Sequence, residues 1–419
     1  MSKFLKILVS IVAVVVTAGE ARAQVDNWTF FGEMPGKLRF ISVPCYATSS
    51  RAQADSLAAS QQLLTNAHNA AHLPVAGNVH LALSAFTFFK DNEYFGKIVD
   101  GYTLFGTQLN PQLVYYPTKE LRLEAGVFLW KDFGNPTLQQ VRPTYRATWT
   151  VKNHQFILGN IRPHLNHGYI EPLFNFERVM LEPLEEGVQY RHLGQRLFVD
   201  VWVDWQRQQY RFSNFQEEIA GGISSSYILT APTSRWGVSL PFQFTATHHG
   251  GQIDTLNKPL QTLFNEALGL EIRRAFNGEA LHAVRLNAYA LGFQDHSFTF
   301  GRLPFKNGTA FYLNGTFETK YADVMLSYFE GEHFIAPLGG DLYQGLSRTV
   351  SDPAYTETVR RVLLLRLLRD FRISDAAALT VRVEPVYDFR SRKTDFSFGF
   401  YLNFRQEWLL GNVQGRVRQ

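Results

Sequence analysis

Apolar and polar residues alternate along much of the chain, most regularly between Asp395 and Leu410. One face of that stretch carries mainly aromatic side chains, namely Phe396, Phe398, Phe400, Leu402, Phe404 and Trp408. The other face carries mainly polar side chains, namely Asp395, Ser397, Tyr401, Asn403, Arg405 and Glu407. A period of two predicts a β-strand with one apolar face and one wet face.

Similar stretches recur, and they predict about 16 strands between Gly77 and Leu410. The clearest further examples are 121–129, 145–149, 197–205, 236–244, 311–317 and 379–387. Short turns, such as Asn277-Gly278, alternate with longer segments, such as 90–101, 163–186 and 331–353. This alternation predicts an up-and-down antiparallel meander with tight turns at one rim and loops at the other. Residues 357–372 also fit an amphipathic helix, but a strand keeps the strand count even.

The first 23 residues have the features of a secretory signal. Lys3 and Lys6 precede an apolar run, and Ala21-Arg22-Ala23 resembles a cleavage site. We therefore expect a signal peptide at 1–23, an N-terminal partly helical segment at 24–76 that is periplasmic or plugs the barrel, a barrel at 77–410 and a C-terminal tail at 411–419.

The composition helps to decide which way the apolar rows face. Aromatic residues make up 14% of the chain, the net charge is only +4, and no run after the signal is long and apolar enough for a helical membrane span. The small charge argues against a nucleic-acid partner, and the single cysteine, Cys45, excludes an intrachain disulfide. Buried strands of a soluble sandwich also alternate, so alternation alone leaves the direction open. The even strand count, the loop rhythm and the mixed charges of the polar rows favour an all-β transmembrane barrel with its apolar rows in lipid.

At this level of pattern, residues 77–410 resemble a porin-like outer-membrane β-barrel of the type widespread in the Bacteroidota. The closing stretch 395–410 is similar to the assembly-signal strand of such barrels, although this chain continues for several residues beyond it. The resemblance implies an outer-membrane location, contacts with outer-membrane lipid and lipopolysaccharide, and insertion by the barrel-assembly machinery. A homotrimer is a further expectation.

A barrel of this size predicts passive diffusion of small polar or charged solutes through its lumen. The pore-lining candidates are the charged and polar residues of the wet rows: Arg122, Glu124, Arg142, Arg146, Asp200, Asp204, Glu271, Arg273, Arg285, Glu318, Arg366, Arg382, Glu384, Tyr401, Arg405 and Glu407. The longest acidic loop supplies the constriction candidates: Glu171, Glu177, Glu182, Glu185 and Glu186. Acidic and basic groups that face each other across a pore would filter solutes by charge.

Two other functions remain open on the sequence. A carrier or exporter of a hydrophobic or polymeric ligand would use residues 24–76 as a plug. An outer-membrane lipid hydrolase would need a nucleophile and a base on the lipid-facing wall, but the chain has no GxSxG motif. We therefore expect no enzyme, no catalytic residues and no cofactor. No metal site is expected either, since His248 and His249 form only a weak pair of potential ligands.

Overall fold

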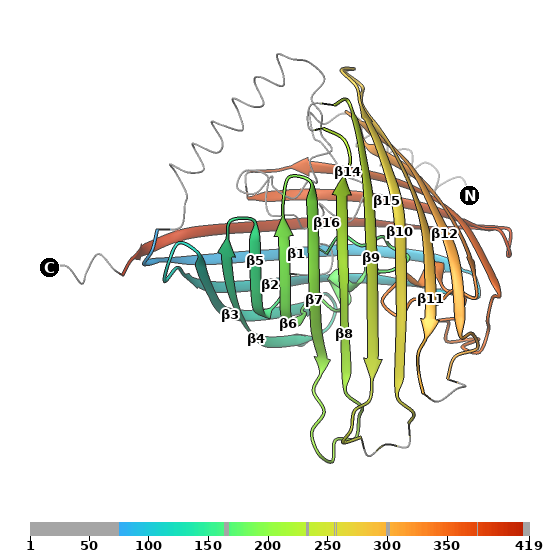
Figure 1. Cartoon of the computed structure of the whole chain (residues 1–419), viewed down its shortest axis with the longest axis horizontal. Coiled ribbons are helices and arrows are strands. Elements are labelled where there is room, and N and C mark those ends of the chain that lie inside the picture. The colour runs from blue at the N-terminus through green and yellow to red at the C-terminus, as the bar shows by residue number, and fades with distance from the viewer. Residues whose placement is uncertain are drawn as a thin grey trace.

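The computed structural model describes residues 75–162, 167–231, 234–254, 256, 258–298, 302–374 and 376–413. The predicted signal peptide and nearly all of segment 24–76 lie outside these residues. The described chain forms a closed antiparallel barrel in which β1 to β16 follow one another in sequence and β1 pairs with β16 (Figure 1). This confirms the prediction of an all-β, up-and-down barrel of about 16 strands.

The first eight strands include the two shortest of the wall. They are β1 (Asn78–Phe95), β2 (Asp100–Tyr115), β3 (Leu121–Asp132), β4 (Gln140–Val151), β5 (His154–Asn160), β6 (Glu186–Leu193), β7 (Leu197–Arg207) and β8 (Glu218–Ile228). The other eight are β9 (Trp236–His249), β10 (Gln261–Ala275), β11 (Leu281–Asp295), β12 (Asn307–Thr319), β13 (Asp323–Glu332), β14 (Val359–Arg372), β15 (Ala377–Asp388) and β16 (Lys393–Asn412). The described helices are a single α-turn, α3 (Arg178–Leu181), and a 3-10 turn, η2 (Asp341–Tyr343).

The apolar rows of the strands point outward and the polar rows point inward. On β10, outward Leu268 is 62% exposed, whereas inward Asn265 is 1% exposed. The Phe row of β16 also lies outside, where its rings contact Phe89 of β1 across the closing seam. Water cannot reach backbone groups in hydrocarbon, and a closed ladder with an apolar outer face satisfies them all internally.

The structure corrects one predicted loop and decides between two predicted structures for one segment. The long segment expected at 90–101 is short, because β1 continues to Phe95 and only residues 96–99 form the turn. Lys90 and Asn92 continue the inward row there, but polar residues on both faces hid the alternation. Residues 359–372 form β14, as the even strand count predicted.

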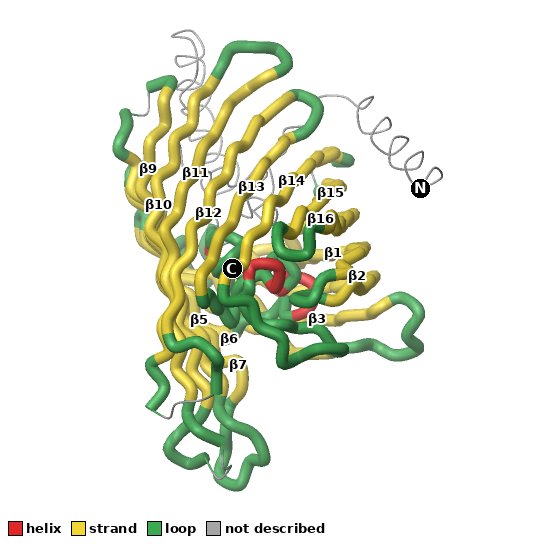
Figure 2. Tube along the Cα trace, turned by 90° about the vertical axis from the view of Figure 1, so that its right-hand side faces the viewer, coloured by secondary structure: helices red, strands yellow, loops and turns green. Residues whose placement is uncertain are grey.

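Two long loops turn into the barrel. We call residues 161–185 the first infolded loop, of which 163–166 lie outside the described residues, and residues 333–358 the second infolded loop. Figure 2 shows short helical segments, in red, within the ring of strands. Among the described residues, no helix is long and apolar enough to cross a membrane.

Candidate functional site

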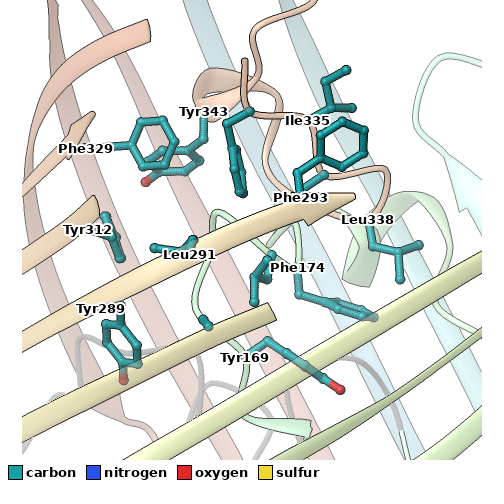
Figure 3. Packing of buried hydrophobic residues seen from close by; sticks show 14 of the residues in the cluster. Tyr169, Phe174, Tyr289, Leu291, Phe293, Tyr312, Phe329, Ile335, Leu338 and Tyr343 are labelled. Atoms are coloured by element: carbon teal, nitrogen blue, oxygen red, sulfur yellow. The ribbon is translucent and has the colours of Figure 1, made fainter. Parts of the chain in front are cut away.

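The two infolded loops share an apolar core with the inner wall of the barrel. Tyr169 and Phe174 of the first loop and Leu338 of the second are buried in one cluster with Tyr289 and Tyr312 of the wall (Figure 3). Burial of such side chains stabilises each loop against the wall by roughly 1.5–3 kcal/mol per large apolar residue. The interior is therefore a packed core over this part of the barrel.

A second apolar cluster fixes α3 to the closing seam. Phe176 and Met180 pack against Phe86 of β1 and Tyr401 of β16, and the rings of Phe176 and Tyr401 meet edge to face at 5.4 Å. Tyr401, a pore-lining candidate, lies beneath the first infolded loop and is 0% exposed.

The first polar anchor of the first loop is Glu171. Arg382 Nη2 donates to Glu171 Oε1 at 2.9 Å, and Arg366 Nη2 donates to Glu171 Oε2. Both arginines also donate to Glu384, from Arg366 Nε at 2.5 Å and from Arg382 Nη2 at 2.7 Å. These side chains form a buried group of two carboxylates and two guanidiniums, in which each charge has opposite neighbours.

Glu177 forms a second anchor at the start of α3. Lys90 Nζ lies 2.9 Å from Glu177 Oε1, and Asn92 Nδ2 donates to the same oxygen at 2.9 Å. Tyr102 donates its hydroxyl to the other oxygen. Burial alone would raise the pKa of Glu177, but the Lys90 charge and these donors lower it, so the carboxylate stays ionised.

A buried histidine forms the third anchor. His167 lies between two carboxylates, with Nε2 at 2.9 Å from Glu185 and Nδ1 at 3.1 Å from Asp200 of β7. Its ring stacks on Trp202 at 4.7 Å. Burial alone would lower the pKa of His167, but the charges of Asp200 and Glu185 raise it to about 9. The imidazolium therefore bridges the start of the loop, its end and the wall.

The raised pKa of His167 predicts weaker loop docking at alkaline pH. The folded-state pKa lies above the usual 6.5, so the stabilisation is complete below about pH 6.5 and is lost as the pH rises through about 9. Between about pH 7 and pH 10 we expect the docked loop to lose about 2 kcal/mol. Hydrogen exchange of residues 167–185 would measure the change.

A His167→Gln variant provides the control for that prediction, because glutamine cannot titrate in this range. After correction for the intrinsic pH dependence of amide exchange, the protection factors of its loop should stay similar across the same pH interval. An equal alkaline loss of protection in wild type and variant would assign the effect to other groups.

The remaining wall candidates lie on inward rows, mostly in ion pairs. At the turn-side end, Arg122 bridges Glu124 and Glu407 at 3.1 Å each, and Arg146 Nη1 lies 3.4 Å from Glu124. Farther round the wall, Glu318 forms salt bridges with Arg273 at 2.6 Å and with Arg285 at 2.9 Å. Asp204 accepts a hydrogen bond from the backbone N–H of Glu186, and Arg405 continues the inward row of β16.

The other constriction candidates behave differently from Glu171 and Glu177. Glu182, directly after α3, is exposed and pairs with Arg178 at 2.7 Å, and Glu186 opens β6, where it pairs with Arg142. The structure thus brings the acidic loop to the basic wall chiefly through Glu171. A polar cavity of about 50 Å³ lies between this loop and the wall, lined in part by Glu271, Arg285 and Arg366.

The outer wall carries a polar group at the loop-side rim that we call the rim cluster: His248, Thr262, Glu266, Gln294 and His296. His248 Nδ1 and Thr262 Oγ1 are 2.8 Å apart. His296 Nε2 lies 2.9 Å from Gln294 Oε1, and Gln294 Nε2 donates to Glu266 Oε1 at 3.3 Å. His248, Thr262, Glu266 and Gln294 lie on the outward rows of β9, β10 and β11, the same rows that carry exposed Leu240, Leu268 and Leu286. His296 directly follows β11.

His249 points the other way from His248, as neighbours on a strand must. Within the described parts of the chain, no group of three or more His, Cys, Asp or Glu side chains is arranged to hold a metal ion.

The sequence reading missed the apolar anchors of the infolded loops and the Thr262–His248 pair. A signal for the first was present, because residues 169–181 are too apolar for a loop exposed to water. The second has no local signal, since its members are 14 residues apart and meet only through the β9–β10 register.

Several solved outer-membrane barrels are similar in structure to this chain. A loop L8 deletion mutant of OmpT, an outer membrane protein of Vibrio cholerae, is 12% identical, with a TM-score of 0.48, covering 79% of this chain and 100% of that one. OprD from Pseudomonas aeruginosa is 9% identical, with a TM-score of 0.45, covering 79% and 94%. OccAB4 from Acinetobacter baumannii is 7% identical, with a TM-score of 0.43, covering 79% and 98%. No curated protein matches the sequence.

A family model described as "Lipid A 3'-O-deacylase-type" matches residues 66–413, which includes the whole described barrel. Because this is an enzyme family, the expectation that the chain is not an enzyme is wrong. The absence of a GxSxG motif is no argument against an enzyme here, because that motif belongs to a strand–turn–helix that a barrel wall does not contain. The chain belongs to the lipid A 3'-O-deacylase-type family.

Proposed function

We propose that this protein is an outer-membrane hydrolase that cleaves acyl esters of lipid A or a closely related acylated glycolipid. The observation that carries the proposal is the family match, which extends over residues 66–413 and so includes every strand of the barrel. The apolar outer wall and the predicted signal peptide support a location in the outer membrane, where such a substrate is found.

The packing of the lumen favours a reaction on the outside of the barrel. An acylated glycolipid is far larger than the cavity of about 50 Å³ beside Glu171 and Arg366. Its acyl chains also remain in hydrocarbon when it diffuses along the outer wall, whereas entry into the lumen would place them against buried charges. The lipid-facing surface near the loop-side rim therefore supports the proposed chemistry best.

The proposed activity predicts release of a fatty acid from lipid A. Purified protein, refolded in mixed micelles with lipid A, should convert it to a species lighter by one acyl group, as seen by mass spectrometry. Heat-unfolded protein in the same micelles is the control. If lipid A keeps all its acyl groups over many hours with correctly folded protein, the proposed substrate is wrong.

Solute passage through the lumen is a second candidate function. It is favoured by the charged inner wall, where Arg122, Glu124 and Arg146 remain near the turn-side end away from the apolar loop core. The infolded loops pack against the inner wall and narrow the space for such passage. The alternative of a plug formed by 24–76 falls almost wholly outside the described residues, but the infolded loops already occupy much of the lumen.

A further inference from the structure

We propose that Thr262 and His248 are the nucleophile and the general base of an acyl-transfer site on the outer wall. This inference rests on the proposed ester hydrolysis and names the residues that would perform it. The Thr262 hydroxyl and the His248 imidazole are 2.8 Å apart, which is within the range that a nucleophile and its base require.

The position of the pair suits a substrate that stays in the membrane. β9 ends at His249 and β10 begins at Gln261, so the pair lies at the loop-side ends of two neighbouring strands. Both side chains are half-buried on the outward face, between the apolar wall and the loops. An ester at the boundary between headgroup and hydrocarbon would meet the pair without leaving the bilayer.

The backbone N–H and carbonyl of Thr262 are both hydrogen-bonded to the segment that follows β11. The N–H donates to Ser297 Oγ at 3.1 Å, and the carbonyl accepts from the N–H of His296 at 2.9 Å. Placement on a strand with such supporting bonds limits the movement of the hydroxyl relative to the base. Preorganisation of this kind is what an acyl-transfer site needs.

The neighbours of the pair can orient a polar headgroup. The side chains of His296, Gln294 and Glu266 form a hydrogen-bonded series along the same outer face. The carboxylate accepts from Gln294 Nε2, and Gln294 Oε1 accepts from His296 Nε2, which leaves Nδ1 of a neutral His296 as an acceptor. Hydroxyl groups of a sugar could donate to these oxygen and nitrogen acceptors.

An apolar surface for the acyl chain continues directly below. Phe264 lies under the ring of His296 at 4.7 Å and contacts Phe244 at 5.4 Å, and Phe242 and Leu268 extend the surface toward the middle of the wall. An acyl chain whose carbonyl reaches Thr262 would lie along these side chains, in register with the surrounding lipid.

The chemical step balances with water as the only co-reactant. Thr262 Oγ1 attacks the ester carbonyl carbon, and its proton passes to His248 Nδ1. The bond from the carbonyl carbon to the sugar oxygen breaks, and His248 returns the proton to that oxygen. Water then attacks the threonine ester with His248 as base, the fatty acid leaves, and Thr262 recovers its proton.

Three variants of the refolded full chain test the pair. Thr262→Ala should lower the rate of lipid A deacylation at least a hundredfold, and His248→Gln should lower it by about 10²- to 10⁴-fold. Thr262→Ser keeps a hydroxyl and should retain activity within about tenfold of wild type. The matched control is Thr107→Ala, since Thr107 is also an outward threonine but bonds to Thr87 Oγ1 at 2.9 Å instead of a histidine.

A second measurement separates this inference from the choice of lipid A as substrate. Protein mixed with a long-chain p-nitrophenyl ester and quenched in acid should carry an acyl group on Thr262, located by peptide mass spectrometry. Acylation of Thr262 without lipid A cleavage would support the pair and overturn the substrate. Lipid A cleavage that is equally fast in Thr262→Ala would overturn the pair and support the substrate. No acylation and no cleavage by folded wild type would overturn both.

Discussion

Glu171→Gln should release the first infolded loop from the barrel wall. The carboxylate of Glu171 accepts from both Arg366 and Arg382, and each of these arginines is about 3% exposed or less. Without its charge, Glu384 is the carboxylate that both buried guanidiniums share, and removal of one partner from a buried ion pair commonly costs about 3–5 kcal/mol. We expect the undocked population to rise roughly a hundredfold or more.

Trypsin cleavage at Arg178 would report this release, because Arg178 is in α3 and its side chain is largely covered while the loop is docked. Cleavage should be faster in Glu171→Gln than in wild type under conditions where the barrel itself stays folded. Glu182→Gln is the matched control, since Glu182 is an exposed glutamate of the same loop whose carboxylate lies 2.7 Å from Arg178 of α3. Its loss should change loop stability by about 0.5 kcal/mol or less. Equal cleavage in both variants would show that the Glu171 group does not hold the loop.

Replacing residues 161–185 with a short turn should open the lumen to ions. Asn160 and Glu186 are already paired at the ends of β5 and β6, so a tight turn can join them without disturbing the wall. The deletion removes Tyr169, Phe174 and α3 from the interior and uncovers the charged wall around Arg366 and Arg382. A 16-stranded barrel without such filling encloses an aqueous channel.

Planar-bilayer recordings would measure the effect. Wild type should show small or rare conductance steps, and the shortened protein should show steps several-fold larger. A matched deletion within 208–217 should leave conductance at the wild-type level, because Gln209 and Gln216 of that segment bond to the neighbouring rim loop at Asp254 and not to the lumen wall. Wide conductance in wild type would show that the infolded loops leave an open path and would favour solute passage.

The enzyme family and the porin-like wall are compatible in physical terms. A barrel wall presents two independent surfaces, because successive residues of a strand point to opposite sides. On β9 and β10 the outward row carries His248 and Thr262, whereas the inward row carries Gln243 and Asn265, which bond to the infolded loops. The inner face can therefore hold the loops while the outer face contacts lipid.

Part of the candidate site was open to prediction from sequence. The acidic loop and the basic wall row were both visible, and Glu171 does meet Arg366 and Arg382. The partners of the other acidic residues could not be predicted. Glu177 pairs with a lysine of β1, and Glu185 pairs with a histidine of its own loop. Which charge meets which depends on the path of the loop through the lumen, and sequence spacing carries no information about that path.

The sequence by itself determined the wall of this protein. Alternation with a period of two is local, so it can be read strand by strand, and it specified the strand number and the two faces of each strand. Together with the even strand count and the loop rhythm, it placed the Phe row of 395–410 outward and the charges inward. Only the tertiary structure decided what fills the barrel and what lies on its rim. Glu171 and Arg366 are 195 residues apart, and Thr262 meets His248 only because β9 and β10 pair in one register. Contacts of this kind arise from loop course and strand register, which depend on the packing of the whole chain.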